Sequence, residues 1–587
     1  MFGSYRDNTT PPQKENRKSS RIVLLKNTGK HALERSRKRL VLVGLGFVIC
    51  FGAVSVRLVE VAVIRGMRSG EEAALATYRA NKPKYPRADI VDRNGVMLAT
   101  TLRTASLYAK PDQIRHPIEV AEELAAILPG INEKELAKGL SSGRSFMWVR
   151  RHLTPKQQQQ VHNLGEPGLV FEPEFKRIYP HKGLFSHALG YVDVDAKGIA
   201  GVEKHFENYL HNDEGDAAPL VLSLDMRIQA ILREELQKAV ADFSGIGAAG
   251  IVLDIRKGEL LSLVSLPEFD PHDPGYADPD HIFNRATVGT YEMGSTFKTF
   301  TMALGLESGV VNLQSGYDAS KPIRIARHTI NDDHPKNRWL SVPEIFAYSS
   351  NIGTARMIMD IGVERQRAFL KALGLFEPVS IELPETATPQ LPSQWSTVSS
   401  MTVSFGHGIS VTPLHLARAV ASLAGNGALL PVTLVKGGND GKEAGEPLLS
   451  PANVVNIRKL LRLVVEHGTG SKANAAGYRV GGKTGTAEKL KNGRYSRDSR
   501  LASFVGIFPA EDPRYVVLAM VDEPKGIKRT YGFAGGGWVA APVVNNVISR
   551  MGPMMGLRPI YDLPSKKQND PKHWVFYDGG SVHAVSF

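Results

Sequence analysis

Ser295 and Lys298 are a pair of residues in this 587-residue chain whose types and spacing could do chemistry. A serine hydroxyl becomes a useful nucleophile when a neighbouring base removes its proton, and a lysine can be that base if burial or a nearby cation lowers its pKa. If a helix opens at Ser295, Lys298 lies on the same face, and free N–H groups point at a developing oxyanion. The apolar run to Leu306 predicts a buried helix that stops at Gly309. An isolated Ser-x-x-Lys is more simply interpreted as a solvated lysine on a surface helix.

Ser349 and Asn351 form a second polar segment, further along the chain. Ser341 and Glu344 predict a capping box that starts a short helix before this segment, and a second helical run is predicted from Thr354. The segment therefore lies where one helix ends and the next begins.

The third segment is Lys483-Thr484-Gly485-Thr486, which follows two glycines and is predicted to lie on a strand. Alone, it is more simply interpreted as a turn with polar residues. Ser-x-x-Lys, Ser-x-Asn and Lys-Thr-Gly in this order are, however, the signature of penicillin-binding proteins and class A β-lactamases. On this ordered triple, the chain resembles the penicillin-binding proteins.

The resemblance implies an acyl transfer through serine. Lys298 would act as general base toward Ser295, and burial together with the charge of Lys483 would lower its pKa. Ser349 would relay the proton to the departing amine, while Asn351 would hold the substrate amide and Lys298 in register. The expected catalytic residues are Ser295, Lys298, Ser349, Asn351 and Lys483.

The strand at 483–486 would bind the substrate. An extended peptide could pair with it by β-augmentation, with Gly485 allowing close approach. Lys483, Thr484 and Thr486 would present a positive charge and hydroxyls to a terminal carboxylate. In the family two backbone N–H groups form the oxyanion hole, and the resemblance assigns them to Ser295 and Thr486.

The basic character of the chain is concentrated at its start. Of the net charge of +13, residues 1–39 carry +8, which argues against a nucleic-acid partner for the rest. Residues 40–64 are predicted to be a transmembrane anchor, and the preceding cations place the N-terminus in the cytoplasm and the rest outside. A cleaved signal peptide is the competing interpretation. The single cysteine, Cys50, excludes a disulfide framework.

Residues 65–214 are expected to form an N-terminal module. Residues 86–95 read as a strand that ends in an Asn-Gly turn, with 96–100 as its hairpin partner. They resemble a box in the N-terminal module of class B penicillin-binding proteins, although Ala88 replaces its usual glycine. Helices are predicted at 116–128, at 133–140 and from Thr154, and a helical stalk at 69–76.

Residues 215–560 are expected to form the transpeptidase domain. A buried hairpin at 248–266, helices and further strands at 501–508 and 515–521 indicate an antiparallel sheet with helices on both faces. The predicted fold class is therefore α+β. Residues 1–30 are predicted to be disordered, and 561–587 are a polar tail without assigned structure.

The resemblance implies a membrane-anchored class B penicillin-binding protein, a D,D-transpeptidase that cross-links peptidoglycan stem peptides and releases D-alanine. It would lie in the bacterial inner membrane with a periplasmic catalytic domain, act on stem peptides and lipid-linked precursor, and be inhibited by β-lactams. Its partners would be a membrane glycan polymerase and other division proteins. The residues before Gly294, Tyr291-Glu292-Met293, look closer to the division-specific branch than to the elongation branch.

The alternatives are an elongation-specific transpeptidase, a β-lactamase, and a penicillin-binding sensor or division scaffold without turnover. No residue is identified that would activate the deacylating water of a β-lactamase. His407, in Gly-His-Gly, is expected to be structural. No metal motif or phosphate loop is found, so no cofactor is expected.

Overall fold

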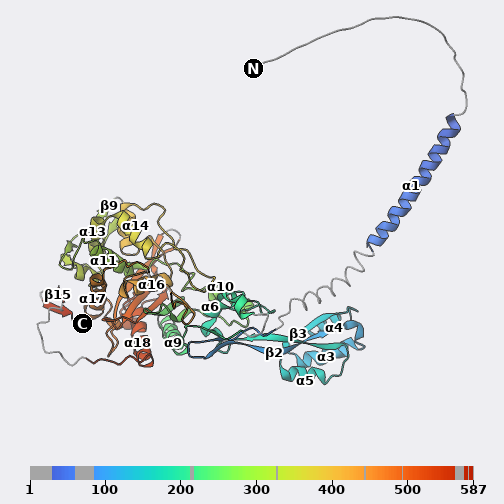
Figure 1. The fold of residues 1–587 in the computed structure, drawn as a ribbon, viewed down its shortest axis with the longest axis horizontal. Helices are drawn as coiled ribbons and strands as arrows, with labels where there is room; N and C mark the ends of the chain where they lie inside the picture. The colour runs from blue at the N-terminus through green and yellow to red at the C-terminus, as the bar shows by residue number, and fades with distance from the viewer. Residues whose placement is uncertain are drawn as a thin grey trace, which may run out of the picture. The chain divides into compact units, whose positions relative to one another are not determined.

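The computed structural model describes residues 29–59, 85–211, 217–325, 328–441, 445–491, 494–561, 574–578 and 581–585. Its first element is the helix α1 (Gly29–Val59), and Val41–Val59 is long and apolar enough to cross a membrane (Figure 1). The helix begins well before residue 40, where the anchor was predicted to start. The predicted stalk at 69–76 and residues 1–28 lie outside the described residues. Residues 29–30, the end of the segment predicted to be disordered, belong to α1 instead.

A mixed sheet with the strand order β3-β2-β1-β5 organises the N-terminal part, and β4 also pairs with β2. Ile90 pairs with Ala99 across the predicted Asn-Gly turn, where Gly95 has a φ of +87°. The strands are β1 (Ile90–Val91), β2 (Met97–Ala109), β3 (Met147–Leu153), β4 (Leu169–Ile178) and β5 (Leu220–Val221). The helices are α3 (Pro117–Ile127), α4 (Glu133–Leu140) and α5 (Pro155–His162). The predicted hairpin and all three predicted helices are confirmed.

The C-terminal part is built on a five-stranded antiparallel sheet in the order β12-β13-β14-β6-β7. The chain enters through the hairpin β6–β7 and completes the sheet with three late strands. Because β12 is an edge strand, one side of its backbone is not used by a neighbouring strand. The strands are β6 (Gly247–Asp254), β7 (Leu260–Leu266), β12 (Gly481–Lys491), β13 (Arg494–Phe508) and β14 (Tyr515–Asp522).

Helices cover both faces of this sheet, as predicted. Alternate residues of β6 divide between two hydrophobic clusters, with Ala248 and Val252 on one face and Ala249 and Ile251 on the other. The first face packs against α9 (Met226–Asp242) and α18 (Ala540–Met554). The second packs against α16 (Pro413–Ala424) and α17 (Pro451–His467), and α11 (Lys298–Glu307) belongs to the same hydrophobic cluster.

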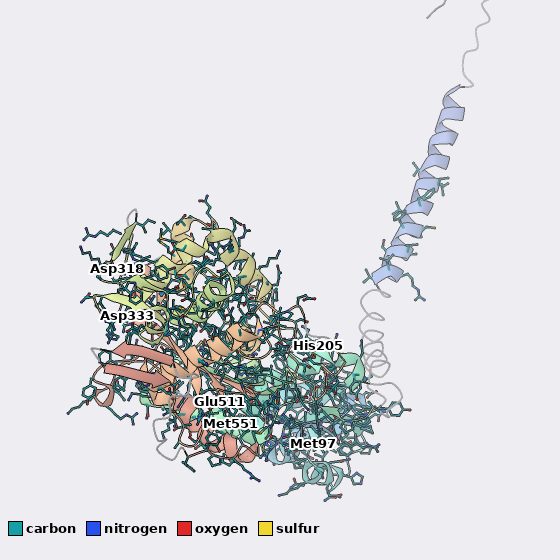
Figure 2. The ribbon with its side chains drawn as sticks, turned by 60° about the vertical axis from the view of Figure 1, so that its left-hand side comes forward. Met97, His205, Asp318, Asp333, Glu511 and Met551 are labelled. Atoms are coloured by element: carbon teal, nitrogen blue, oxygen red, sulfur yellow. The ribbon has the colours of Figure 1, made fainter. Side chains whose placement is uncertain are left out.

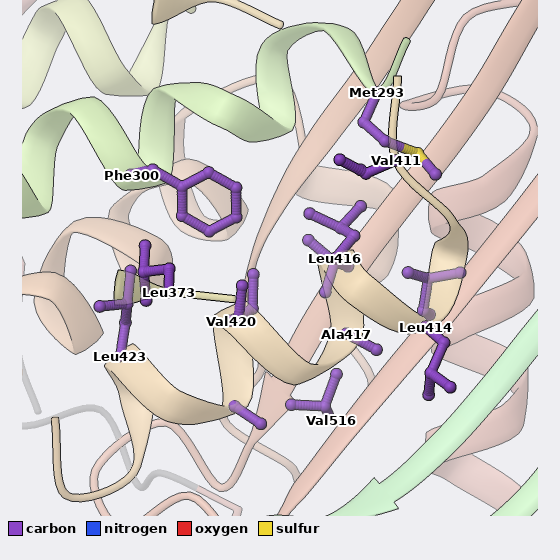
Figure 3. Packing of buried hydrophobic residues seen from close by; sticks show 14 of the residues in the cluster. Met293, Phe300, Leu373, Val411, Leu414, Leu416, Ala417, Val420, Leu423 and Val516 are labelled. Carbon is purple, nitrogen blue, oxygen red and sulfur yellow. The ribbon is translucent and has the colours of Figure 1, made fainter. Parts of the chain in front are cut away.

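The helix α16 fills the space between α11 and the sheet. Leu416 and Val420 of α16 lie between Phe300 of α11 and Val516 of β14 (Figure 3). Almost the entire circumference of α11 is buried, which confirms the prediction from its apolar run. The site residues on this helix are therefore held by a packed core.

Further helices lie next to the second polar segment. They are α12 (Val342–Ala347), α13 (Asn351–Ile361), α14 (Val363–Ala372) and α15 (Thr397–Ser404). The capping box of Ser341 and Glu344 at the start of α12 is confirmed. The helix α13 begins at Asn351, before the predicted Thr354, because Ser350 caps it by accepting a hydrogen bond from the N–H of Gly353.

Two of the remaining expectations need correction. Ser295 does not open an α-helix: it lies in a 3-10 turn, η5 (Gly294–Phe297), and α11 follows directly. The positive φ of Gly294, +52°, turns the chain sharply into this element. The polar tail also contains two paired strands, β15 (Trp574–Asp578) and β16 (Ser581–Val585), which had no sequence signal that we recognised.

Candidate active site

Ser295 and Lys298 lie side by side at the start of α11. The Oγ atom of Ser295 is 2.9 Å from the Nζ atom of Lys298. The lysine is completely buried, while Ser295 is half-buried. The 3-10 turn preserves the pairing that the three-residue spacing predicted, and it leaves the hydroxyl within reach of a substrate.

The amine of Lys298 is surrounded by oxygen atoms. Its Nζ lies 2.7 Å from the carbonyl oxygen of Ser349, 2.7 Å from Oδ1 of Asn351 and 3.0 Å from Oγ of Ser349. Carbonyl and amide oxygens can only accept hydrogen bonds, so they take both N–H groups of a neutral amine. The lone pair of that amine is then left for the hydroxyl of Ser295 or of Ser349.

The backbone at Ser349 is unusual. Its φ of +61° places a residue with a side chain in the left-handed region, at a cost of about 1–2 kcal/mol. This conformation accompanies the hydrogen bond between its carbonyl oxygen and Lys298. Strain of this kind is typical of functional sites.

A loop that the sequence analysis did not identify supports this segment. Asp332 accepts hydrogen bonds from the hydroxyl of Ser350 (2.7 Å) and the N–H of Ile352 (2.9 Å). The side-chain amide of Asn351 donates to the carbonyl of Asn331 (2.9 Å). Figure 2 marks the adjacent Asp333 in the connection between β10 (His328–Ile330) and β11 (Trp339–Ser341). The polar residues of this loop only weakly indicate a functional role in the sequence, because no regular spacing connects them to Asn351.

Lys483 reaches the same place from the sheet. Its Nζ lies 3.1 Å from Oγ of Ser349 and 5.7 Å from the centre of the Phe346 ring, and its side chain is fully buried. The hydroxyl of Ser349 is therefore in contact with two lysine amines. The three motifs, far apart in the sequence, meet at this hydroxyl.

Burial lowers the pKa of both lysines. It brings the pKa of Lys298 to about 7, although the negative charges of Asp332 and Asp333 act in the opposite direction. The pKa of Lys483 falls well below its ordinary value, first through burial and then through the charge of Lys298. Burial is thus the main cause at both lysines. The charge of Lys298 adds to it at Lys483, whereas Lys483 is not among the causes at Lys298, contrary to our expectation.

The strand β12 lies against the turn that carries Ser295. A Cβ atom on Gly294 would come within 2.5 Å of the carbonyl oxygen of Thr486, and one on Gly485 would come within 2.6 Å of the carbonyl oxygen of Met293. Both glycines are therefore required by contacts within the chain. The crowding at Gly485 differs from our expectation that its missing side chain makes room for a substrate.

The two threonines of the motif have defined partners. The hydroxyls of Thr484 and Thr469 are 2.7 Å apart, and Oγ1 of Thr486 accepts a hydrogen bond from the N–H of Gly536 (3.0 Å). Thr469 and Gly536 were not identified from the sequence, since they belong to distant segments without a motif. These contacts fix both hydroxyls on β12.

His407 lies in the loop before α16. Its ring contacts those of Phe405 and Tyr495, with centroid distances of 5.5 and 5.9 Å. Burial and the charge of Lys298 lower its pKa, which favours the neutral ring. Among the described residues, no group of three or more His, Cys, Asp or Glu side chains is arranged to hold a metal ion.

Comparisons with known proteins agree with this arrangement. Residues 248–549 match the family model of the penicillin-binding protein transpeptidase domain, and residues 83–229 match that of the penicillin-binding protein dimerisation domain. The chain is 37% identical to the probable peptidoglycan D,D-transpeptidase FtsI of Caulobacter vibrioides over 548 residues, covering 90% of this chain and 92% of that one. It is 27% identical to the peptidoglycan D,D-transpeptidase FtsI of Escherichia coli K12, covering 83% and 87%.

The fold is also similar to solved structures. Penicillin-binding protein 3 from Mycobacterium tuberculosis, complexed with aztreonam, superposes with a TM-score of 0.63 at 23% identity, covering 82% of this chain and 99% of that one. The chain thus belongs to the class B penicillin-binding proteins, and within them to the division-type branch.

Proposed function

We propose that this protein is a peptidoglycan D,D-transpeptidase of septal wall synthesis. It joins two stem peptides through a serine acyl-enzyme and releases D-alanine. The observation that carries the proposal is the position of the Lys298 amine, within 3.0 Å of two hydroxyls and with both of its N–H groups directed to carbonyl oxygens. The FtsI relatives, which align over most of the chain, support the same activity.

Acylation begins with Ser295. Neutral Lys298 removes the proton of its hydroxyl, and Oγ attacks the carbonyl carbon of the terminal D-alanyl-D-alanine bond. The N–H groups of Ser295 and Thr486 stabilise the oxyanion, an arrangement worth about 3–4 kcal/mol for each donor. The packing of Gly294 against Thr486 supports this pairing.

The leaving amine then needs a proton. Ser349 donates its hydroxyl proton to this nitrogen as the C–N bond breaks, and Lys298 passes to Ser349 the proton that it took from Ser295. D-alanine leaves, and the peptide is held as an ester. An amine of a second stem peptide then attacks this ester. Its proton passes through Ser349 and Lys298 to Oγ of Ser295, and the serine hydroxyl is restored.

Two site residues take supporting roles in this proposal. Asn351 orients Lys298 and the substrate amide. The buried amine of Lys483 acts on the hydroxyl of Ser349, and its burial fits this role better than a direct contact with the substrate carboxylate. In this proposal the substrate carboxylate is bound by Thr484, Gly485 and Thr486, together with the free edge of β12.

The proposal also covers the membrane topology, the domains and the partners of this protein. Among the described residues, α1 is the one helix long and apolar enough to cross a membrane, and together with the FtsI relatives it supports a single-pass membrane protein. We place the N-terminus in the cytoplasm and the catalytic domain in the periplasm. We divide the chain into a basic cytoplasmic tail (1–39), a transmembrane anchor (40–64), an N-terminal module (65–214), a transpeptidase domain (215–560) and a C-terminal tail (561–587). A membrane glycan polymerase would supply the glycan strands, other division proteins would assemble with the pair, and β-lactams would acylate Ser295.

The test is turnover on the natural type of substrate. The full-length protein in detergent is incubated with lipid-linked precursor, with and without a glycan polymerase, and both D-alanine release and cross-links are measured. The proposal expects both products with the polymerase, and neither with Ser295→Ala. A protein that binds penicillin but never joins peptides would be a sensor or scaffold instead.

A further inference from the structure

Glu292 lies three residues before Ser295 and connects three segments beside the site. Its Oε1 atom accepts hydrogen bonds from the N–H of Gly408 (2.8 Å) and the hydroxyl of Tyr495 (3.0 Å). Its second oxygen, Oε2, is buried without a hydrogen-bond partner. One carboxylate oxygen therefore holds both the loop before α16 and the strand β13.

The backbone before Ser295 is already tied to that loop. Tyr291 and Val411 exchange two backbone hydrogen bonds of 2.9 Å, and the N–H of Gly294 donates to the carbonyl of Gly406 (3.2 Å). Figure 3 shows the side chain of Met293 beside that of Val411. Glu292 adds a side-chain contact to these backbone bonds and extends the connection to the hairpin β12–β13.

This hairpin needs such a connection, because it projects beyond the sheet. The strand β14 pairs with β13 only as far as Leu501, whereas β12 and β13 continue to pair to Lys491 and Arg494, past a register shift after Glu488. A two-stranded hairpin is marginally stable on its own. At its base, Lys489 bonds to Asp522 and Glu523, at 2.8 and 3.1 Å.

The second attachment lies further out, at Tyr495. Its bond to Glu292 connects the projecting hairpin directly to the turn of the nucleophile. Because β12 also carries Thr486, movement of the hairpin changes the position of the Thr486 N–H relative to Ser295. Burial raises the pKa of the Glu292 carboxyl, because the charged form loses contact with water.

We infer that Glu292 is a positioning residue for acylation: by holding Tyr495 and Gly408, it keeps the oxyanion donor of β12 at a fixed distance from Ser295. The inference rests on the proposed role of Ser295. Glu292 itself does not touch the reacting atoms in this proposal. Its effect should therefore appear in the rate constant of acylation and leave the initial binding of the acylating agent unchanged.

The test uses a fluorescent penicillin and the full-length protein, with stopped-flow measurement of the binding constant and the acylation rate constant. Tyr495→Phe removes one hydrogen bond to a carboxylate and should lower the acylation rate constant about threefold to fivefold. Glu292→Ala should lower it about tenfold or more. Glu292→Gln keeps an acceptor oxygen and should recover most of the activity.

The double variant separates coupling from general damage. In the Glu292→Ala background, Tyr495→Phe should have no further effect, because its partner is already absent. Tyr276→Phe, at an exposed tyrosine, is the matched control and should behave like the wild type. Independent, multiplying effects of the two changes, or a change confined to the binding constant, would overturn the inference. Failure of the acyl-enzyme proposal itself would appear separately, as labelling of Ser295→Ala.

Discussion

The Nζ atom of Lys298 lies 2.7 Å from the Oδ1 atom of Asn351. This contact joins the first two motifs directly and helps to set the direction of the lysine lone pair. Replacing Asn351 by aspartate would put a negative charge at the same distance. We expect Asn351→Asp to keep Lys298 protonated and to move the rise of the acylation rate about one to three pH units upward.

The measurement is the rate of acylation by penicillin as a function of pH. Asn351→Ala serves as the control, since it removes the contact without adding charge and should lower the rate without the upward shift. An Asn351→Asp profile that rises at the same pH as the wild type would contradict the assignment of Lys298 as the base.

The wild-type protein should itself show this dependence. Burial lowers the pKa of Lys298 to about 7. The amine must be neutral to accept a proton, so acylation should be slow below this pH, rise through it and level off above. Lys298→Met should lower the rate about 10²–10⁴-fold and abolish the rise. A wild-type profile that stays flat over about one pH unit on each side of this pKa would speak against a lysine base.

Removing the charge of Asp333 should shift the pH at which acylation rises in the opposite direction to Asn351→Asp, and by less. Its negative charge raises the pKa of Lys298, and its side chain is exposed. Asp333→Asn should therefore move the rise in acylation to lower pH, by a few tenths of a unit in dilute buffer. Because salt screens an exposed charge, the shift should shrink at about 1 M salt. An upward shift would show that this charge acts in another way.

Acylation should require a glycine at position 294 but not at position 309. Gly294 and Gly309 both have a positive φ, +52° and +69°, so alanine at either position costs about 1–2 kcal/mol. Only at Gly294 would the new Cβ collide with Thr486, since nothing lies within 4 Å of one at Gly309. We expect both variants to lose melting temperature through backbone strain, Gly294→Ala the more because of the added collision, and a loss of acylation only for Gly294→Ala. Equal acylation by the two variants would contradict the close contact between the nucleophile turn and β12.

Much of this arrangement could be predicted from the sequence, because some of its constraints are local. A three-residue spacing places Lys298 beside Ser295 in a 3-10 turn followed by a helix almost as well as in a single helix. The alternating and continuous apolar runs identified the hairpin β6–β7 and the buried helix α11. The capping box at Ser341 and Glu344 depends on neighbouring residues alone, and it was found correctly.

The constraints that were missed are not local. The left-handed backbone of Ser349 and its support by Asn331 and Asp332 depend on contacts between separate segments. The close approach of Met293 to Gly485 could not be distinguished, from the sequence, from room left for a substrate. Likewise, the direction of the buried Lys483 side chain is set by the packing of β12 against Phe346 and Ser349.

The identity of the acylated residue decides whether Ser295 is the nucleophile. The full-length protein is treated with penicillin, digested, and analysed by mass spectrometry to locate the added mass. If Ser295 is the nucleophile, the mass is found on Ser295 in the wild type and is absent from the whole protein in Ser295→Ala. Modification of Ser349 or any other residue in the wild type, or persistent labelling of Ser295→Ala, would contradict this assignment.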